Sequence, residues 1–299
     1  MYTKRDRRGH PLFPQYLDAS PLTDRFPALA CVLKRLNLLM MMTMAGCAGS
    51  SPATGPQSAF APPELNPPAD SAPLQPKIVK QFCANRTLVT FVIDDGWITD
   101  YTIKKPIFDA HGAVGVLAII SARRPQSEVR LREMQAAGWE IASHTRTHRD
   151  LTTLNREELE SEIAGSKAEL EAIGLHVHAL VYPYGRGNRL VQRLSRQYYD
   201  ATAQIGHGFN RLDAGEPSAL GREIFGAQYA RPDQHSLRFY RAEVDSARKA
   251  GRWLIFAVHE LIDSDAQDLS DLLDYVQVKS LPIVTLTQGL ALRRACRTP

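Results

Sequence analysis

Short apolar runs alternate with longer amphipathic stretches over most of this chain. Six runs rich in aliphatic and aromatic residues are predicted to be strands, namely 88–93, 114–120, 139–142, 179–182, 253–258 and 282–286. Between them, apolar residues recur at helical spacing, which predicts helices over 100–110, 128–137, 156–173, 187–199, 236–250 and 267–279. Nearly continuous apolar strands that alternate with helices are typical of a parallel sheet covered by helices.

The number of these strand–helix units predicts an α/β barrel, either complete or incomplete. The clearest helix is 156–173, because Asn155 is a suitable N-cap and Glu158 stands three residues later, as in a capping box. A doubly wound open sheet is the alternative architecture.

The first 47 residues are predicted to be a leader. An apolar run at 36–44 follows Lys34-Arg35 and precedes Ala45-Gly46-Cys47. This run is shorter than the roughly 20 residues that a membrane-spanning helix needs, and its basic flank and small residues indicate an export signal. Residues 45–47 resemble a bacterial lipobox, which implies that Cys47 carries a lipid and becomes the mature N-terminus. A buried apolar helix with a stray cysteine is the alternative.

Residues 48–80 are predicted to be a disordered linker. Eight of the 19 prolines lie between positions 48 and 76, among Ala, Ser and Gln. Such a composition buries too little apolar surface to fold and forms a semi-extended tether. Residues 81–299 then remain as one domain of catalytic size.

The excess of positive charge lies in the leader. The 299 residues include 36 Lys and Arg and 32 Asp and Glu, and residues 1–35 alone contain seven basic and three acidic residues. The rest of the chain is therefore neutral. Proteins that bind nucleic acid need a basic face that displaces counterions from phosphates, so we expect no nucleic-acid partner.

The four cysteines are divided between the leader and the predicted domain. Cys31 lies in the leader, Cys47 is the proposed lipid site, and Cys83 and Cys296 stand near the two ends of the predicted domain. Export permits a disulfide between the last two, since domain ends often lie close together. Two free thiols are the alternative.

Two polar motifs follow predicted strands. Asp94-Asp95-Gly96 ends the strand 88–93, and His144 and His148 follow the strand 139–142. Two imidazoles four residues apart on a helical turn face the same way and can reach one metal ion. Two imidazoles and a carboxylate suit a divalent ion with open coordination positions. Taken alone, either motif is also compatible with an ordinary solvated turn or a chance pair of histidines.

Two further motifs complete the set. The sequence Tyr-Pro-Tyr-Gly at 182–185 ends the fourth predicted strand, and His259 ends the strand 253–258. A lone histidine at such a place is more often structural. All four motifs, however, fall at the carboxyl ends of predicted parallel strands, the rim on which α/β barrels build active sites.

In this order the motifs resemble those of the polysaccharide deacetylases, which form carbohydrate esterase family four and contain the NodB-homology domain. The resemblance covers about residues 88–290 and implies the distorted (β/α) barrel of that family. It implies that Asp94 is the general base, that His259 is the general acid, and that the backbone N–H of Tyr184 helps to hold the oxyanion.

The resemblance also implies one divalent metal ion, bound by Asp95, His144 and His148. Imidazole and carboxylate ligands favour zinc, and they also suit cobalt, nickel and manganese.

The chain departs from the family at two places. Family members often carry an arginine two residues before the proline of the third motif, where it orients the catalytic aspartate, and Val181 stands there. We hypothesise that Arg222 replaces it and orients Asp94. An Asp-Trp motif is absent from residues 200–250, so the sequence offers no acidic partner for His259.

The implied activity is hydrolysis of acetyl groups on a polysaccharide or cell-envelope glycan, with release of acetate. The acetyl group is N-linked or, alternatively, O-linked, and peptidoglycan, chitin-like oligomers, exopolysaccharide and xylan are candidate substrates. The competing function is a non-catalytic, glycan-binding envelope lipoprotein on the same fold. Lipidation of Cys47 would anchor the exported protein in the cell envelope, on the periplasmic side of the outer membrane in a Gram-negative cell.

Four side chains are candidates for contact with the substrate, namely Trp97, Tyr182, Pro183 and Arg222, and Tyr184 is a further aromatic at the rim. Aromatic rings at a rim are suited to stack on sugar faces. Packing in the core is the alternative role for these rings.

Overall fold

The computed structural model describes residues 75–295, apart from residues 125, 213–218, 231–233 and 263 and the side chains of Cys83 and Ala295. The leader, Cys47, nearly all of the linker and Cys296 lie outside the described residues. Export, lipidation and the Cys83–Cys296 disulfide therefore stay predictions. Among the helices that are described, none has the length and apolar character needed to cross a membrane.

The described strands form one sheet that closes on itself. They are β1 (Leu88–Ile93), β2 (Val116–Ile119), β3 (Glu140–Ser143), β4 (Ala179–Val181), β5 (Ala201–Ile205), β6 (Phe209–Arg211), β7 (Leu220–Phe225) and β8 (Arg252–Val258). Parallel pairing follows the order β1-β2-β3-β4-β5-β7-β8, and β8 pairs again with β1. The short β6 runs antiparallel beside the first half of β8, whose second half pairs with β7. The predicted barrel is confirmed as a closed ring of seven parallel strands.

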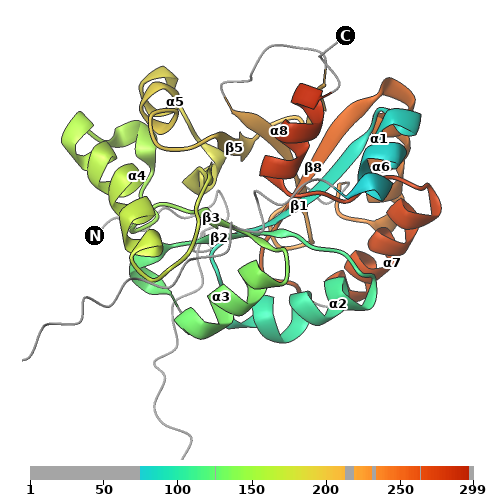
Figure 1. Ribbon diagram of the computed structural model, residues 1–299, viewed down its shortest axis with the longest axis horizontal. Helices are drawn as coiled ribbons and strands as arrows, with labels where there is room; N and C mark the ends of the chain where they lie inside the picture. Colours follow the sequence, from blue (N-terminus) through green and yellow to red (C-terminus); the bar gives the residue numbers. More distant parts are fainter. Residues whose placement is uncertain (1–74, 125, 213–218, 231–233, 263, 296–299) are drawn as a thin grey trace, which may run out of the picture. The chain divides into compact units, whose positions relative to one another are not determined.

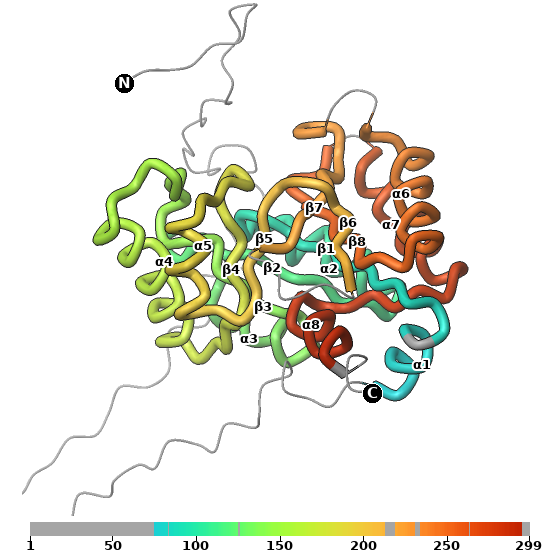
Figure 2. The backbone as a smooth tube through the Cα atoms, turned by 90° about the horizontal axis from the view of Figure 1, so that it is seen from above, coloured from blue at the N-terminus to red at the C-terminus, as the bar shows by residue number. Residues whose placement is uncertain are grey.

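Helices surround this ring (Figure 1). They are α1 (Pro76–Asn85), α2 (Lys105–Ala110), α3 (Glu128–Ala136), α4 (Arg156–Glu171), α5 (Arg189–Ser195), α6 (Leu237–Ala250), α7 (Asp265–Val278) and α8 (Leu286–Ala295). A π-helical turn at Asp100–Lys104 leads into α2, and short 3-10 turns occupy Ser121–Arg123, Leu151–Thr153 and Pro183–Gly185. Figure 2 shows α4 and α5 on one side of the strands and α6 and α7 on the other. The predicted capping box at Asn155 and Glu158 is present.

Side chains that alternate along the strands divide the core into two clusters. One fills the ring, where small residues such as Ala118 and Ala142 lie among larger ones such as Trp253. The other packs outward-facing residues such as Phe91 and Phe256 against the helices. Because both faces of the strands are buried, several strands read as unbroken apolar runs in the sequence.

The structure corrects the predicted elements at three places. Strands β5, β6 and β7 and helices α1 and α8 were not predicted. The apolar run 282–286 is not a strand, because it makes one isolated bridge, Val89 to Ile283, before α8 begins. Helix α1 begins at Pro76, so the predicted linker boundary at residue 80 lies too far along the chain.

Helix α8 closes the amino end of the barrel. Leu286 and Leu290 belong to the cluster inside the ring. The buried carboxylate of Glu140 accepts a hydrogen bond from the backbone N–H of Thr287 (3.1 Å) at the start of this helix. The helix can approach the ring closely because position 289 is glycine, and a Cβ atom there would lie 2.3 Å from the Trp253 ring.

We therefore expect Gly289→Ala to lower the free energy of unfolding by on the order of 2 kcal/mol, as overpacking does in a close-packed core. Chemical denaturation measures this change. Gly206→Ala is the matched control, because a Cβ atom at residue 206 would meet open space. Equal stability of Gly289→Ala and the unsubstituted protein would contradict the close approach of α8.

Candidate active site

The closure of the barrel places Asp94 beside His259. Asp94 follows β1 and His259 follows β8, and these strands pair up to Ile93 and Val258. The backbone N–H of Asp94 continues the ladder by donating to the carbonyl of Val258 (2.9 Å). Two residues that are far apart in the sequence thus become neighbours at the carboxyl rim, where α/β barrels bind their substrates.

Asp95, His144 and His148 form a cluster that can hold a metal ion. Their potential ligand atoms all lie within 4.8 Å of one another. The Nε2 atoms of His144 and His148 lie 3.6 and 3.5 Å from Oδ1 of Asp95. The other ring nitrogen of His144 is 2.8 Å from the carbonyl oxygen of Val181. With the proton on that nitrogen, Nε2 keeps its lone pair for a metal ion.

The charge state of the cluster also suits a metal. Burial and the charge of His144 lower the pKa of His148 to about 4, so this imidazole is neutral near pH 7. Neutral imidazole is the form that binds metals. A carboxylate with two imidazoles is a typical donor set for a catalytic divalent ion, so the three residues that the sequence predicted fit such an ion.

We expect His148→Ala to weaken zinc binding by on the order of 100-fold or more, because even residues that only hydrogen-bond to a metal ligand affect affinity by about 10- to 100-fold. Competition with a chromophoric chelator measures the affinity. His178→Ala is the control, since His178 pairs with Asp200 outside the cluster. Unchanged zinc affinity in His148→Ala would remove this residue from the metal site.

The backbone around the cluster adopts unusual conformations. Four residues of the site have a positive φ, namely Asp95 (76°), Thr145 (65°), His148 (63°) and Tyr184 (57°). Each such residue costs on the order of 1–3 kcal/mol and persists only where its surroundings fix it. In the loop after β3, the carboxylate of Glu162 on α4 accepts the backbone N–H of Thr147 (2.8 Å) and its hydroxyl. Glu162 thereby holds the segment that carries both histidines, a role that the sequence did not reveal.

Asp94 lies in a buried pocket of positive charge. One oxygen, Oδ1, accepts a hydrogen bond from Nη1 of Arg222 at 2.7 Å, and both side chains are almost fully buried. The other oxygen, Oδ2, is 3.5 Å from Nε2 of His259. Burial alone would raise the pKa of Asp94, but the charges of Arg222, His144 and His259 and the Arg222 hydrogen bond outweigh it and lower the pKa to about 2. The pairing of Arg222 with Asp94, hypothesised from the sequence, is present, with the arginine on β7.

His259 has an unusual environment for an ionisable side chain. Its Nδ1 atom is buried and has no hydrogen-bond partner among the described residues. The ring of Tyr229 packs against the imidazole, with 4.4 Å between the centroids. Burial lowers the pKa of His259, and the charges of Asp94 and Asp95 oppose this effect. Tyr229 was not among the residues predicted from the sequence.

The aromatic residues at the rim have different roles. Tyr184 is half exposed, and its ring lies 4.8 Å from that of His148. Tyr182 is fully buried in the core, so its predicted stacking on a sugar is wrong and the core-packing alternative holds. Pro183, at the start of the 3-10 turn, is also buried. The indole N–H of the half-buried Trp97 donates to Oδ2 of Asp95 (3.3 Å), so this ring supports a metal ligand.

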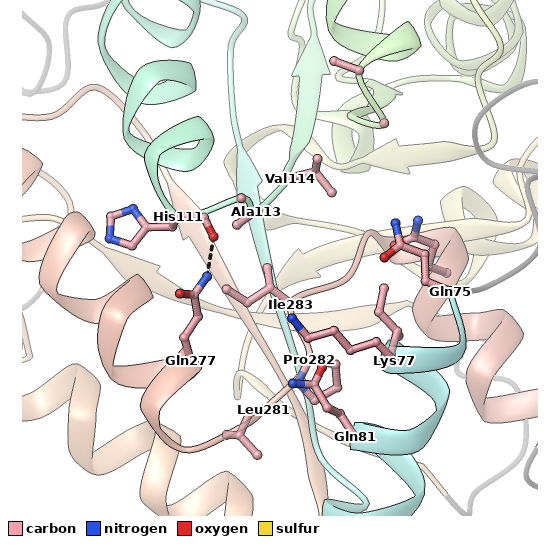
Figure 3. Close-up of a pocket in the computed structure, with 15 residues that line it drawn as sticks. Gln75, Lys77, Gln81, His111, Ala113, Val114, Gln277, Leu281, Pro282 and Ile283 are labelled. Carbon is pink, nitrogen blue, oxygen red and sulfur yellow. Dashed lines mark hydrogen bonds between the residues drawn. The ribbon is translucent and has the colours of Figure 1, made fainter.

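A separate cavity of about 460 Å³ lies at the amino ends of the strands (Figure 3). It is lined in part by Lys77 and Gln81 of α1, by residues 111–114 ahead of β2, and by Leu281 and Pro282. This is the edge opposite to the metal cluster, and in α/β barrels it serves stability rather than catalysis.

Comparison with known families agrees with this geometry. Residues 82–201 match the family described as polysaccharide deacetylase. This part of the chain is therefore similar in sequence to that family, and the barrel has the fold of a solved deacetylase structure. No curated protein matches the chain.

Solved structures of several deacetylases and of one pseudoenzyme share the fold of this chain. The T48 deacetylase, solved with substrate, is 20% identical with a TM-score of 0.53, over 70% of this chain and 93% of the other. Peptidoglycan deacetylase PdaC from Bacillus subtilis is 16% identical with a TM-score of 0.51, over 70% and 92% of the two chains. BA3943, a pseudoenzyme of carbohydrate esterase family four from Bacillus anthracis, is 15% identical with a TM-score of 0.52, over 68% and 65%. At these identities the likeness concerns the fold.

Proposed function

We propose that this protein hydrolyses N-acetyl groups on the sugars of a polysaccharide or cell-envelope glycan and releases acetate, with one divalent metal ion as cofactor. The observation that carries this proposal is the placement of an ionised, buried Asp94 beside the cluster of Asp95, His144 and His148. A base next to a metal site is the arrangement that metal-assisted hydrolysis requires.

Asp95, His144 and His148 would hold the ion, for which zinc is the first candidate and cobalt, nickel and manganese are others. When bound, a divalent ion activates water and polarises the acetyl carbonyl. The ligands themselves are oriented by their neighbours, since Val181 fixes the tautomer of His144 and Trp97 bonds to Asp95.

Asp94 is the proposed general base. The low pKa keeps its carboxylate ready to accept a proton, and the bond from Arg222 to Oδ1 leaves Oδ2 turned toward His259. Oδ2 therefore accepts the proton of the attacking water in our account. Arg222 acts on Asp94 and is not itself expected to contact the substrate.

His259 is the proposed general acid. An amine is a poor leaving group until it is protonated, and Nε2 of His259, next to Asp94, is placed to supply that proton. The lowered pKa of this imidazole makes its protonated form a stronger acid. The backbone N–H of Tyr184 would stabilise the oxyanion that forms during the attack. Acetate and a free amino sugar are the products.

The proposed location follows from the leader. We infer that the protein is exported and anchored in the cell envelope through a lipid on Cys47, with the segment that follows acting as a tether. Envelope glycans would then be within reach of the catalytic domain. Mass spectrometry of the mature N-terminus tests this inference, and an unprocessed Met1 would contradict it.

Two observations favour a second candidate function, glycan binding without catalysis. Nδ1 of His259 has no partner among the described residues, and one of the similar structures is that of a pseudoenzyme. The residues proposed as metal ligands, base and acid nevertheless lie together at the rim, and this supports hydrolysis as the function we propose.

Acetate release from a substrate panel tests the proposal. The panel contains peptidoglycan, chitin oligomers, an acetylated exopolysaccharide and acetylated xylan, incubated with zinc-loaded protein. Equal amounts of acetate and new free amine are expected from an N-acetylated substrate. Acetate without amine would indicate O-deacetylation, and binding without acetate would indicate the non-catalytic alternative.

A further inference from the structure

A buried carboxylate connects the loop that follows β7 to the loop that follows β8. Asp265 is the first residue of α7 and is 3% exposed. Its Oδ1 accepts the backbone N–H of Ala227 at 3.2 Å, in the loop after β7. Its Oδ2 accepts the backbone N–H of Ile262 at 3.1 Å, in the loop after β8. The acceptor is a carboxylate that is itself shielded from water, and both conditions strengthen a hydrogen bond.

Each of the two loops carries one of a pair of contacting rings. Tyr229 stands two residues after Ala227, and His259 stands three residues before Ile262. The ring centroids of Tyr229 and His259 are 4.4 Å apart. A second bond, from the backbone N–H of Gly226 to the hydroxyl of Tyr240 on α6 (2.8 Å), fixes the start of the first loop.

The imidazole of His259 needs such support. Its Nδ1 has no hydrogen-bond partner among the described residues, and its Nε2 is held only at 3.5 Å from Asp94. Hydrogen bonds therefore do little to fix the rotation of the ring, and packing against Tyr229 is one contact that limits it. The half-exposed Tyr229 keeps its place because the loop beneath it is bonded to Asp265.

We propose that Asp265 is a positioning residue that joins the β7–α6 and β8–α7 loops and thereby sets the packing of Tyr229 against His259. The inference rests on the proposed function for its catalytic consequence, because the ring that is positioned is the proposed general acid. A misplaced acid would slow the departure of a leaving group that needs a proton, and a displacement of about 1 Å can cost on the order of 100-fold in rate.

The structural part of the proposal is tested by NMR of the zinc-loaded protein. The imidazole Cε1–H signal of His259, assigned by its loss in His259→Gln, is expected to carry a ring-current shift from Tyr229. Tyr229→Leu, a change at an exposed position, removes that shift and gives the reference. Asp265→Ala should move the signal toward this reference, whereas Asp268→Ala, at a nearby acidic residue of α7, should leave it in place. An unmoved signal in Asp265→Ala, or in Tyr229→Leu, would overturn the proposal.

The catalytic part is tested by comparing two leaving groups. Deacetylation of an N-acetylated glycan needs a proton on the amine, whereas 4-nitrophenyl acetate releases a phenolate that leaves without one. The measured quantity is the kcat for glycan deacetylation divided by the kcat for hydrolysis of 4-nitrophenyl acetate. Asp265→Ala and Tyr229→Leu should lower this ratio by about 10-fold or more, and Tyr229→Phe should keep it near the value of the unsubstituted protein. An equal loss in both reactions, or a rise in KM alone, would contradict a role in positioning the acid.

If the unsubstituted protein released no acetate from any glycan, the proposed function would fail while the NMR comparison still decided the role of Asp265.

Discussion

Asp94→Asn is expected to lower the kcat for acetate release by on the order of 1,000-fold and to leave zinc binding intact. The change removes the group proposed to accept the proton of water, and general base catalysis contributes about 100- to 10,000-fold. Asparagine keeps the shape of the side chain and can still accept the bond that Arg222 donates to Oδ1. The metal ligands are other residues, so the affinity for zinc should change little.

Asp94→Asn and the unsubstituted protein are compared by their steady-state rates of acetate release and by the zinc content of the same preparations. Asp109→Asn is the matched control, because Asp109 pairs with Lys105 on the surface of α2, away from the site. A rate for Asp94→Asn near that of the unsubstituted protein would show that another group is the base. Loss of zinc from Asp94→Asn would place Asp94 among the metal ligands instead.

Arg222→Met is expected to lower kcat by about 100-fold and the free energy of unfolding by on the order of 3 kcal/mol. Removal of one partner leaves the other as an uncompensated buried charge, which typically costs about 3–5 kcal/mol. The Asp94 side chain is only 2% exposed, so water can do little to replace the arginine on Oδ1. The base would also lose the bond that orients it.

The stability difference between Arg222→Met and the unsubstituted protein is expected to depend on pH. The pKa of Asp94 falls from its ordinary value of 3.8 to about 2 in the folded protein. The stabilisation from its charged partners is therefore fully present above about pH 4 and is lost as the pH falls toward 2. Denaturation of the metal-free protein should show that the gap in stability between Arg222→Met and the unsubstituted protein narrows over this range.

A double substitution separates the two effects of Arg222. Asp94→Asn combined with Arg222→Met leaves no unpaired charge, so stability should recover in part while activity stays low. Wild-type stability and rate in Arg222→Met alone would show that the ion pair is unimportant. A gap that widens with falling pH would contradict the charge assignment.

The strands that could be predicted from the sequence are those with unbroken apolar runs. Five of the six predicted runs are strands, and their carboxyl ends meet at one rim as expected. Strands β5 and β7 escaped prediction because small and polar residues, such as Thr202, Gln204 and Arg222, interrupt them. The run 282–286 is apolar because it packs against β1, although it pairs at a single residue. Burial, and not strand formation, explains its composition.

At the site, too, only residues that belong to a local sequence pattern could be predicted. The two aspartates and two histidines could be predicted because each pair lies within a few residues of a strand end. The partner of Asp94 lies 128 residues away, so Arg222 could only be hypothesised until the closed barrel placed β7 two strands from β1. Glu162, Tyr229 and Asp265 belong to no local pattern, because their roles arise from contacts between loops that only the fold brings together.

The most direct test of the whole account is the metal dependence of acetate release. Zinc is removed with a chelator, the protein is dialysed, and acetate release from the best glycan of the panel is measured before and after zinc is restored. We predict that activity disappears on removal and returns on addition of about one equivalent of zinc, and that neither state of His148→Ala is active. Acetate release that survives complete removal of the metal, or that never appears when zinc is bound, would contradict the proposal that Asp94 works beside a metal ion held by Asp95, His144 and His148.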